Sequence, residues 1–548
     1  MSRLPNISSV DRGESHAPSK WRGILRLLIR YRLPILIAMA FYRLIGLGFS
    51  EMQQGGESIV ALRVQTILRF GDLWDQSPHM LSGISNAMYP PLYAWFSASS
   101  VLMIGDMLWV YRLPSALAAA ALAILLYRFA RMSMSTVRAL IVAGLFAFAP
   151  LPTFLSRQAL PDLLFMCAIT AAVYFSWHAM RGRSRGAMLL AGLSLGAALM
   201  TGGAFALTVP VSLAAAGLMM PPYLRRRAWG TAAAVTVVSI PLWLPWTWSM
   251  TAAHGGGDPF WILSAARSFH ISAGIVEAEQ HAGLLTIAYR LLVLLLLLFP
   301  FALYFLWQAL YERRHPLWTF VATFILCGLA AGWMTGAHSE STFLPLLPLL
   351  MYAGVHGWRL LRPTRGKLRM MLSLPTLLIY LALLSVFTMQ QIWRVDPEAY
   401  DDGARRAAAL LRVCDAERVL LVGNGDNPQL TWQLEGADIG WIATEELRYE
   451  RLEPFALGVE AIRERAAGYA DSLRVVMLVE RDEIARGVYR EAAEVLPPDF
   501  TLHLQTRRYI VAGSSSVRWR PDSATGRETV WTDHPTVGHS AAFIIIPQ

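Results

Sequence analysis

Charged residues, cysteine and lysine are scarce in this chain of 548 residues, and each scarcity excludes a class of protein. Only 16% of the residues are charged and 55% are hydrophobic, with a mean hydropathy of +0.41, which excludes an ordinary soluble globular protein. The 3 cysteines exclude a disulfide scaffold. We expect Cys167 and Cys327 inside membrane spans and Cys414 alone in an external tail, without an internal disulfide outside the membrane. Lysine occurs only as Lys20 and Lys367, so arginine supplies nearly all the positive charge.

Long apolar stretches recur between residues 34 and 390. One of them, Leu291 to Leu310, reads LLVLLLLLFPFALYFLWQAL, a run that no soluble core needs. A bilayer core takes about 20 apolar residues per helix, so the sequence predicts a polytopic α-helical membrane protein with about 11 to 13 transmembrane helices. The basic first 32 residues lead into an apolar stretch without a small-residue cleavage site, which indicates a retained anchor rather than a signal peptide.

Arginine clusters in short loops set the predicted orientation, because cytoplasmic loops of membrane proteins carry an excess of Arg and Lys. The net charge of +10 therefore indicates topology rather than a nucleic-acid partner. The clusters lie at 20–32, 128–138, 181–185, 225–227, 313–314 and 359–369. Placing them inside puts the N-terminus in the cytoplasm, the C-terminus outside and about eleven crossings between them. The segment Pro91 to Gly105 is apolar but short, and it is predicted to be re-entrant or juxtamembrane. The predicted crossings are 34–50, 113–130, 138–155, 161–178, 187–201, 204–220, 229–248, 284–308, 317–335, 343–358 and 370–390.

After Gln391 the sequence changes to soluble character. Apolar strands at 418–426 and 474–480 alternate with helix-like stretches at 456–467 and 482–495, a pattern typical of a small α/β domain. The turn Gly423-Asn-Gly-Asp426 lacks a full Gly-x-Gly-x-x-Gly, so it indicates an ordinary strand-ending turn rather than a nucleotide site. The predicted organisation is a cytoplasmic N-terminus at 1–32, a transmembrane domain at 33–390 with an external loop at 51–112, and an external α/β domain at 391–548.

Arg157 and Asp162 lie at the start of an apolar helix that begins Asp-Leu-Leu-Phe-Met-Cys-Ala. An ionised carboxylate there loses hydration unless it faces water, a cation or a substrate, and the cost reaches roughly 3 kcal/mol at the bilayer centre. The pair is therefore a candidate functional site. The plain alternative is that both residues only mark the water boundary.

Several short motifs occur in a recognisable order. Glu57 opens a predicted helix, and Gly71-Asp72 follows it. Then come Pro90-Pro91-Leu92-x-x-Trp95, Arg112-Leu-Pro-Ser-Ala-Leu117 and the Arg157 to Asp162 segment. None of these motifs is specific alone. Their order and spacing over residues 34–358 resemble the bacterial lipid A aminoarabinose transferases and the wider protein O-mannosyltransferase-like GT-C glycosyltransferases.

That resemblance implies a membrane enzyme that takes a sugar from a polyprenyl phosphate and transfers it, at the outer face, to a lipid, glycan or protein acceptor. Glycosyl transfer of this kind requires cations near the leaving phosphate, a carboxylate beside the acceptor hydroxyl and an apolar groove for the prenyl chain. The resemblance therefore predicts Glu57 and Asp162 as the catalytic acids, with Arg157 orienting Asp162 or binding phosphate. The alternative for Glu57 is that it only stabilises the N-terminus of its helix.

The sequence departs from the family pattern in three ways. The family's leading Asp-Glu pair aligns with Gly56-Glu57, so the usual aspartate position holds glycine. The lysine before Pro-Pro-Leu is Tyr89 here. The family's Thr-Lys-Gly turn is Thr201-Gly202-Gly203, and the basic residue expected near 339–341 is replaced by Glu340. These departures predict a donor site that is rebuilt or lost.

Phosphate recognition without lysine has to use arginine, histidine or backbone amides, and the guanidinium fork suits phosphate oxygens well. Histidines at 79, 254, 270, 281 and 338 are predicted to be external, but they lack metal-ligand spacing. No metal site and no cofactor are therefore predicted, while the need for a divalent metal stays open. Arg290 is a further arginine on the predicted outer side. The predicted substrate-binding side chains are Arg63, His79, Tyr89, Arg157, Arg267 and Glu340.

The leading functional prediction is a polyprenyl-phosphate-sugar-dependent glycosyltransferase of the bacterial inner membrane with a periplasmic C-terminal α/β domain. Its partners are predicted to be the sugar donor, membrane lipid and an envelope lipid, glycan or protein acceptor, but no nucleic acid. A non-catalytic binding or scaffold protein with the same fold is the alternative, because expected side chains are missing. A transporter is less favoured, because no inverted repeat is visible and charges within the spans are few.

Overall fold

The computed structural model of the chain contains two compact units. The first comprises residues 1–49, 72–76 and 86–394, and the second comprises 50–71, 77–85 and 395–548. The domain boundaries predicted from the sequence stay a prediction. The structure describes residues 26–27, 29–48, 56–76, 90–182, 184–254, 298–312, 315–334, 340–360, 407, 410–411, 416–422, 448–452, 457–480, 495–505, 509–517, 529–532 and 541–544.

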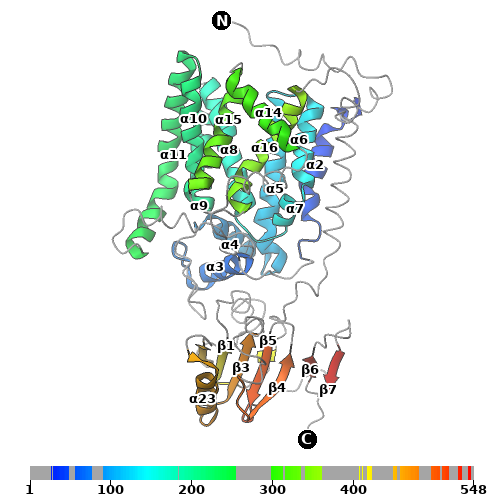
Figure 1. The fold of residues 1–548 in the computed structure, drawn as a ribbon, viewed down its shortest axis with the longest axis vertical. Helices are drawn as coiled ribbons and strands as arrows, with labels where there is room; N and C mark the ends of the chain where they lie inside the picture. Colours follow the sequence, from blue (N-terminus) through cyan, green and yellow to red (C-terminus); the bar gives the residue numbers. More distant parts are fainter. Residues whose placement is uncertain are drawn as a thin grey trace. The chain divides into compact units, whose positions relative to one another are not determined.

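The first unit is a bundle of helices (Figure 1). Within the described ranges, 5 segments are long and apolar enough to cross a membrane: Leu108–Arg131, Asp162–Gly182, Arg185–Met219, Pro222–Ala253 and Pro316–Trp333. The predicted multi-pass membrane protein is confirmed, while the number of crossings stays a prediction. The elements are α2 (Arg32–Phe41), η3 (Tyr42–Leu44), α4 (Leu92–Ile104), α5 (Leu108–Arg131), α6 (Thr136–Phe148), α7 (Pro150–Leu155), α8 (Asp162–Gly182), α9 (Arg185–Gly202), η4 (Gly203–Leu207), α10 (Thr208–Met219), α11 (Pro222–His254), α14 (Phe299–Tyr311), α15 (Pro316–Met334), η7 (Glu340–Leu346) and α16 (Leu347–Leu360).

The short helix α4 occupies the segment predicted to be re-entrant or juxtamembrane. Its 13 residues, at 1.5 Å per residue, span about 20 Å, which is short of a bilayer core of roughly 30 Å. The helix ends at Gly105, whose φ of +117° is a conformation that favours glycine. Just before this end, Leu102 and Met103 are 76% and 85% exposed. Helix α4 is thus too short for a full crossing, and its re-entrant or juxtamembrane position stays a prediction.

Helices α9 and α11 pack closely through two glycines. Gly192 lies against Val238, and Gly196 lies against Leu242 one turn further along both helices. Because the contacts advance in the same order, the two helices run parallel. A Cβ at either glycine would overlap its partner side chain, so the close approach depends on the missing side chains.

The chain reverses direction between α9 and α10. Gly217, near the end of α10, packs on Trp229 near the start of α11, and Trp229 Nε1 donates a hydrogen bond to the Ala214 carbonyl at 3.0 Å. Helix α10 is therefore antiparallel to α11 and to α9. The turn lies in Gly203–Leu207, where Gly203 has a φ of +70°. The apolar stretch Arg185–Met219 is thus two antiparallel segments, as the separate predicted crossings at 187–201 and 204–220 require.

Arginine-rich helix ends lie together at one end of the bundle. Ser115 at the start of α5 donates a hydrogen bond to the Leu160 carbonyl just before α8, so both helices begin at the same end. Both also finish in arginine, with Arg128 and Arg131 in the last turn of α5 and Arg181 in the last turn of α8. This shared end agrees with the positive-inside pattern. The side of the membrane that it faces stays a prediction.

The second unit contains helix α3 (Gly56–Phe70) and a sheet of order β2-β1-β3-β5-β4-β6-β7. Strand β1 pairs in parallel with β2 and β3, and β5 is antiparallel to β3 and β4. Helix α23 (Val459–Ala470) follows β2, and its Ile462 and Ala466 pack with Leu420 and Met477 on one face of the sheet. The predicted α/β domain is confirmed. The strands are β1 (Arg418–Val422), β2 (Arg448–Leu452), β3 (Val475–Glu480), β4 (Phe500–Gln505), β5 (Tyr509–Ser514), β6 (Thr529–Thr532) and β7 (Ala541–Ile544).

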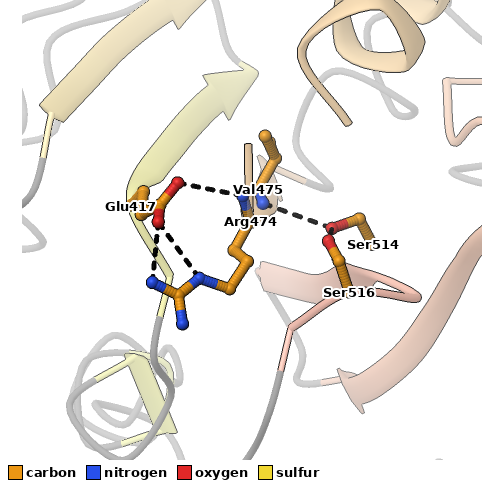
Figure 2. A network of polar contacts seen from close by, with 5 residues as sticks. All are labelled: Glu417, Arg474, Val475, Ser514 and Ser516. Atoms are coloured by element: carbon orange, nitrogen blue, oxygen red, sulfur yellow. Dashed lines mark hydrogen bonds and ion pairs between the residues drawn. The ribbon is translucent and has the colours of Figure 1, made fainter. Parts of the chain in front are cut away.

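A polar network joins the amino ends of β1 and β3 to the end of β5 (Figure 2). Arg474 donates to Glu417 Oε1 from Nε at 3.2 Å and from Nη2 at 2.6 Å. The Val475 backbone N–H donates to Ser514 Oγ at 3.2 Å, and Ser514 Oγ lies 2.9 Å from Ser516 Oγ. The paired side chains are 41% and 40% exposed, so the ion pair contributes at most about 1 kcal/mol. The network orders the strand ends and gives no sign of a ligand site.

Replacing Gly192 by alanine is expected to destabilise the α9–α11 interface. The added Cβ would overlap Cβ and Cγ1 of Val238, a β-branched side chain with little rotamer freedom. Overpacking of this kind costs about 1–3 kcal/mol, so the purified protein should melt at a lower temperature. Gly230→Ala in α11 is the control, because no heavy atom lies within 4 Å of its added Cβ. Equal melting temperatures for the two variants would contradict the described packing.

Candidate functional site

The motif Arg112-Leu-Pro-Ser115 lies in the first turns of α5 and locks this helix onto α4. Pro114 is inside the helix, where it removes a backbone donor and bends the chain. The neighbouring Tyr111 carbonyl accepts hydrogen bonds from Ser97 Oγ at 2.8 Å and from Tyr93 OH at 3.1 Å. Both donors come from α4, so side chains of one helix hold the first turns of the other.

Ser115 joins this helix pair to the start of α8. Its Oγ donates to the Leu160 carbonyl at 2.7 Å and lies 2.8 Å from Tyr93 OH. Ser115 is 0% exposed and Tyr93 is 1% exposed, so water does not compete for these bonds. The next residue, Pro161, accepts the hydrogen bond from the Phe165 backbone N–H at 2.9 Å that begins the helix. The backbone therefore enters α8 in a fixed geometry.

Asp162 is the first residue of α8, at the positive end of the helix dipole, where a carboxylate is stabilised. One of its oxygens, Oδ2, is buried and has no hydrogen-bond partner among the residues that the structure describes. A buried acceptor left in this state costs free energy, and native proteins rarely keep one without a reason. This oxygen is therefore available to a substrate hydroxyl or to a cation.

Arg157 lies in the same connection but binds the main chain of another segment. Its Nη1 donates to the Ile45 carbonyl at 2.9 Å, and its Nη2 donates to the Gly46 carbonyl. Arg112 Nη1 donates to the following carbonyl, that of Leu47, at 2.7 Å. Burial first, and the nearby charge of Arg112 second, lower the pKa of Arg157, which still remains protonated at physiological pH. Two arginine side chains thus hold one turn and place positive charge near it.

The turn Thr201-Gly202-Gly203 packs against α8 close to Asp162. A Cβ at Gly202 would overlap the ring of Phe165, which lies one helical turn after Asp162. Phe165 meets Phe205 edge-on, with ring centroids 6.2 Å apart and an interplanar angle of 74°. The position where the family pattern has lysine therefore has no room for a side chain. That the donor site is rebuilt or lost stays a prediction.

Two tryptophans attach residues 72–76 to the bundle. Trp95 Nε1 on α4 donates to the Leu73 carbonyl at 2.8 Å, and Trp246 Nε1 on α11 donates to the Trp74 carbonyl at 3.2 Å. Trp74 and Trp95 also meet edge-on, with ring centroids 6.1 Å apart. Trp95 belongs to the Pro-Pro-Leu-x-x-Trp motif and Trp246 to the pair Pro245-Trp246 in the sequence, and both act as anchors. They hold the residues that follow Gly71 against α4 and α11.

The predicted site residues fall into three groups in the structure. Asp162 and Arg157 belong to the first unit. Glu57 and Arg63 lie on α3 in the second unit and are 1% and 2% exposed. The prediction that Glu57 and Asp162 are the catalytic acids stays a prediction, because the two residues belong to different units. Glu340 begins η7, with its side chain outside the described part. His79, Tyr89, Arg267 and Arg290 lie outside the described residues.

Sequence reasoning did not identify Ser115, Tyr93 or Trp246 as residues that build the site. Ser115 and Trp246 lie in motifs that the sequence displays, but their partners are 45 and 172 residues away along the chain. A motif gives residue types and their spacing. It does not show which carbonyl accepts a hydrogen bond from the side chain. Among the described residues, no group of three His, Cys, Asp or Glu side chains is arranged to hold a metal ion.

Comparison with protein families gives one match in the region that builds the site. The family model described as dolichyl-phosphate-mannose-protein mannosyltransferase matches residues 88–249. That stretch contains α4, the Arg112–Ser115 motif, Asp162 and the Gly202 turn. Among curated proteins, no sequence matches this chain.

Solved structures share the fold at low sequence identity. The crystal structure of ArnT from Cupriavidus metallidurans bound to undecaprenyl phosphate is 14% identical with a TM-score of 0.66, and the match covers 90% of this chain and 98% of that one. Its apo state gives a TM-score of 0.63 at 14% identity over the same shares. The apo oligosaccharyltransferase from Archaeoglobus fulgidus is 13% identical with a TM-score of 0.51, over 89% of this chain and 75% of that one. The resemblance predicted from the motifs is confirmed, because the chain has the GT-C glycosyltransferase fold in a divergent sequence.

Replacing Arg157 by methionine is expected to destabilise the ligand-free protein. The change leaves the carbonyls of Ile45 and Gly46 without their charged donor in a buried place, which costs about 1–3 kcal/mol. The measurement is the melting temperature of purified protein in detergent. Arg226→Met, at an exposed arginine of α11, is the control. An unchanged melting temperature for Arg157→Met would show that Arg157 has no structural role.

Proposed function

We propose that the chain is a polyprenyl-phosphate-sugar-dependent glycosyltransferase of the bacterial inner membrane that acts at the periplasmic face. The observation that carries this proposal is the Asp162 carboxylate. Its Oδ2 is buried at the start of a membrane helix and lacks a hydrogen-bond partner within the described part of the chain. Ionisable groups at such positions are costly, and they are typical of functional sites.

The proposed reaction is the transfer of a sugar between two oxygens. An acceptor hydroxyl attacks the anomeric carbon of the donor sugar, the bond from that carbon to the phosphate oxygen breaks, and polyprenyl phosphate leaves with the electron pair. The proton of the acceptor hydroxyl passes to a carboxylate. Asp162 and Glu57 are the proposed acids, and the glycines before Glu57 allow its backbone to adjust. The longer side chain of Glu57 is proposed to substitute for the aspartate that Gly56 replaces.

Arginine is proposed to supply the positive charge that the leaving phosphate needs. Arg157 is already ionised and close enough to Arg112 for their charges to interact. Arginine is weakly hydrated and can bind two phosphate oxygens at once, which suits a site at a membrane boundary. Arg63, Arg267, His79, Tyr89 and Glu340 complete the proposed binding set.

The bound lipid in a neighbouring structure supports the choice of donor. The ArnT structure that contains undecaprenyl phosphate shares its fold with 90% of this chain. A polyprenyl chain needs an apolar groove, which a chain with 55% hydrophobic residues can supply. We therefore propose a polyprenyl phosphate as the sugar carrier, and an envelope lipid, glycan or protein as the acceptor.

A non-catalytic binding or scaffold role is the second candidate. The packing of Phe165 against Gly202 favours it, because a basic side chain at position 202 has no room there. A protein of this kind would keep the lipid-binding fold and would not transfer the sugar. The two candidates therefore agree on donor binding and differ on turnover.

A transfer assay separates the two candidates. The purified protein in lipid nanodiscs is given a radiolabelled polyprenyl-phosphate sugar and a crude envelope acceptor, with and without divalent metal, and label in the acceptor is counted. We expect Asp162→Asn and Glu57→Gln to lower the rate by at least about 100-fold, the range that general acid–base groups contribute. Glu460→Gln is the control, because Glu460 also lies in the first turn of a helix, α23, and should not change the rate.

The outcomes of this assay are distinct. If the wild type transfers the label and both acid variants transfer it at the same rate, Asp162 and Glu57 are not the catalytic acids. Donor binding by the wild type without any transfer, with every envelope fraction tested, would favour the scaffold role. Loss of transfer in Asp162→Asn alone would keep Asp162 and exclude Glu57.

A further inference from the structure

We infer that Ser115 and Tyr93 are positioning residues for Asp162, acting through the Leu160 carbonyl and setting the turnover of the site without touching the substrate. This inference rests on the proposed function of Asp162. It assigns a task to two buried hydroxyls, on α4 and α5, that the proposed reaction does not use directly. Their exposed fractions are 1% for Tyr93 and 0% for Ser115.

The hydrogen bonds between these residues have a single possible direction. A carbonyl can only accept, so Ser115 gives its one hydroxyl proton to the Leu160 carbonyl at 2.7 Å. Ser115 Oγ must then be the acceptor in its 2.8 Å contact with Tyr93, which shares its one hydroxyl proton between Ser115 Oγ and the Tyr111 carbonyl at 3.1 Å. The resulting chain runs from Tyr93 to Ser115 to Leu160. Hydrogen bonds in such a chain polarise and strengthen one another.

A hydrogen bond to the Leu160 carbonyl constrains the backbone that leads into Asp162. This carbonyl precedes the helix, and the first helical hydrogen bond is accepted by the Pro161 carbonyl instead. Pro161 has a fixed φ, and the residue before a proline is restricted as well, so few backbone rotations separate Leu160 from Asp162. Fixing the Leu160 carbonyl therefore fixes the direction in which the Asp162 side chain leaves the backbone.

This indirect control matters for Asp162 because the described residues hold its buried Oδ2 by no hydrogen bond. Arg157 is the charged residue nearest to Asp162 in the sequence, and its Nη1 and Nη2 donate hydrogen bonds to the carbonyls of Ile45 and Gly46. A carboxylate that must meet a reacting hydroxyl tolerates little displacement, and about 1 Å of misplacement can lower a rate by about 100-fold.

Ser97 provides a matched control within the same cluster. Like Ser115 it is fully buried, and its Oγ donates to a main-chain carbonyl, that of Tyr111, at 2.8 Å. Its bond stays between α4 and α5 and does not reach the segment before α8. Ser115→Ala removes two buried hydrogen bonds and Ser97→Ala removes one, and only Ser115 is connected to Asp162.

The test compares Ser115→Ala, Tyr93→Phe and Ser97→Ala in the nanodisc transfer assay. We expect Ser115→Ala to lower kcat by about 10- to 100-fold with KM within about twofold of the wild type, because a misplaced carboxylate affects turnover more than binding. Tyr93→Phe should lower kcat by a smaller factor, since Ser115 still reaches Leu160. Ser97→Ala should keep kcat within about twofold of the wild type. Melting temperatures of all three show whether each variant is folded, and Tyr93→Phe retains the test if Ser115→Ala does not fold.

A double variant shows whether Ser115 acts through Asp162. In an Asp162→Asn background, Ser115→Ala should change the residual rate by less than about twofold, because coupled residues are not additive. A fall by the same factor as in the wild type would overturn the inference, as would equal kcat values for Ser115→Ala and Ser97→Ala. If Asp162→Asn itself transfers sugar at the wild-type rate, the proposed catalytic role of Asp162 fails. If Asp162→Asn is inactive while Ser115→Ala is fully active, only the positioning role fails.

Discussion

Main-chain carbonyls that are released where membrane helices bend or end must find donors within the protein, because lipid offers none. This constraint shapes the end of the bundle that contains Asp162. Arg43 donates to the carbonyls of Phe146 and Ala147, while Arg112 and Arg157 serve the turn at residues 45–47. Ser115 donates a hydrogen bond to the Leu160 carbonyl, and two tryptophans donate to carbonyls of the segment at 72–76. The place of Asp162 thus follows from how these carbonyls are satisfied.

The near absence of lysine gives this arrangement a second consequence. A guanidinium has five donors in a rigid fork, so one Arg157 side chain can bind two consecutive carbonyls, which a single ammonium group does less readily. The same fork is what a phosphate would require. In a chain with only Lys20 and Lys367, structural cations and substrate-binding cations are therefore the same residue type. Sequence patterns alone do not separate the two tasks. Arg157 was predicted to orient Asp162 or to bind phosphate, and its described hydrogen bonds go to main-chain carbonyls.

The features that the sequence predicted correctly are those that depend on local composition. Apolar length predicts a multi-pass helical bundle, arginine in turns predicts which helix ends lie together, and alternating strands and helices predict the α/β unit. The reversal at Gly203–Leu207 was also predictable, because two crossings had to fit between 187 and 220. The partners of Ser115, Arg157 and Trp246 were not predictable. They are 45, 112 and 172 residues away, and their selection depends on the three-dimensional packing of whole helices.

The glycine at position 202 shows how the loss of one charged residue changes its surroundings. Any side chain there would overlap the ring of Phe165, so the small residue and the aromatic ring depend on each other. Restoring a basic residue at 202 therefore requires a smaller residue at 165 as well. Phe165 and Phe205 pack edge-on at this turn, so position 202 cannot supply a cation to the proposed donor phosphate unless the rings repack. Because a phosphate that leaves water without a paired cation is costly, the proposed donor site has to take its positive charge from arginine.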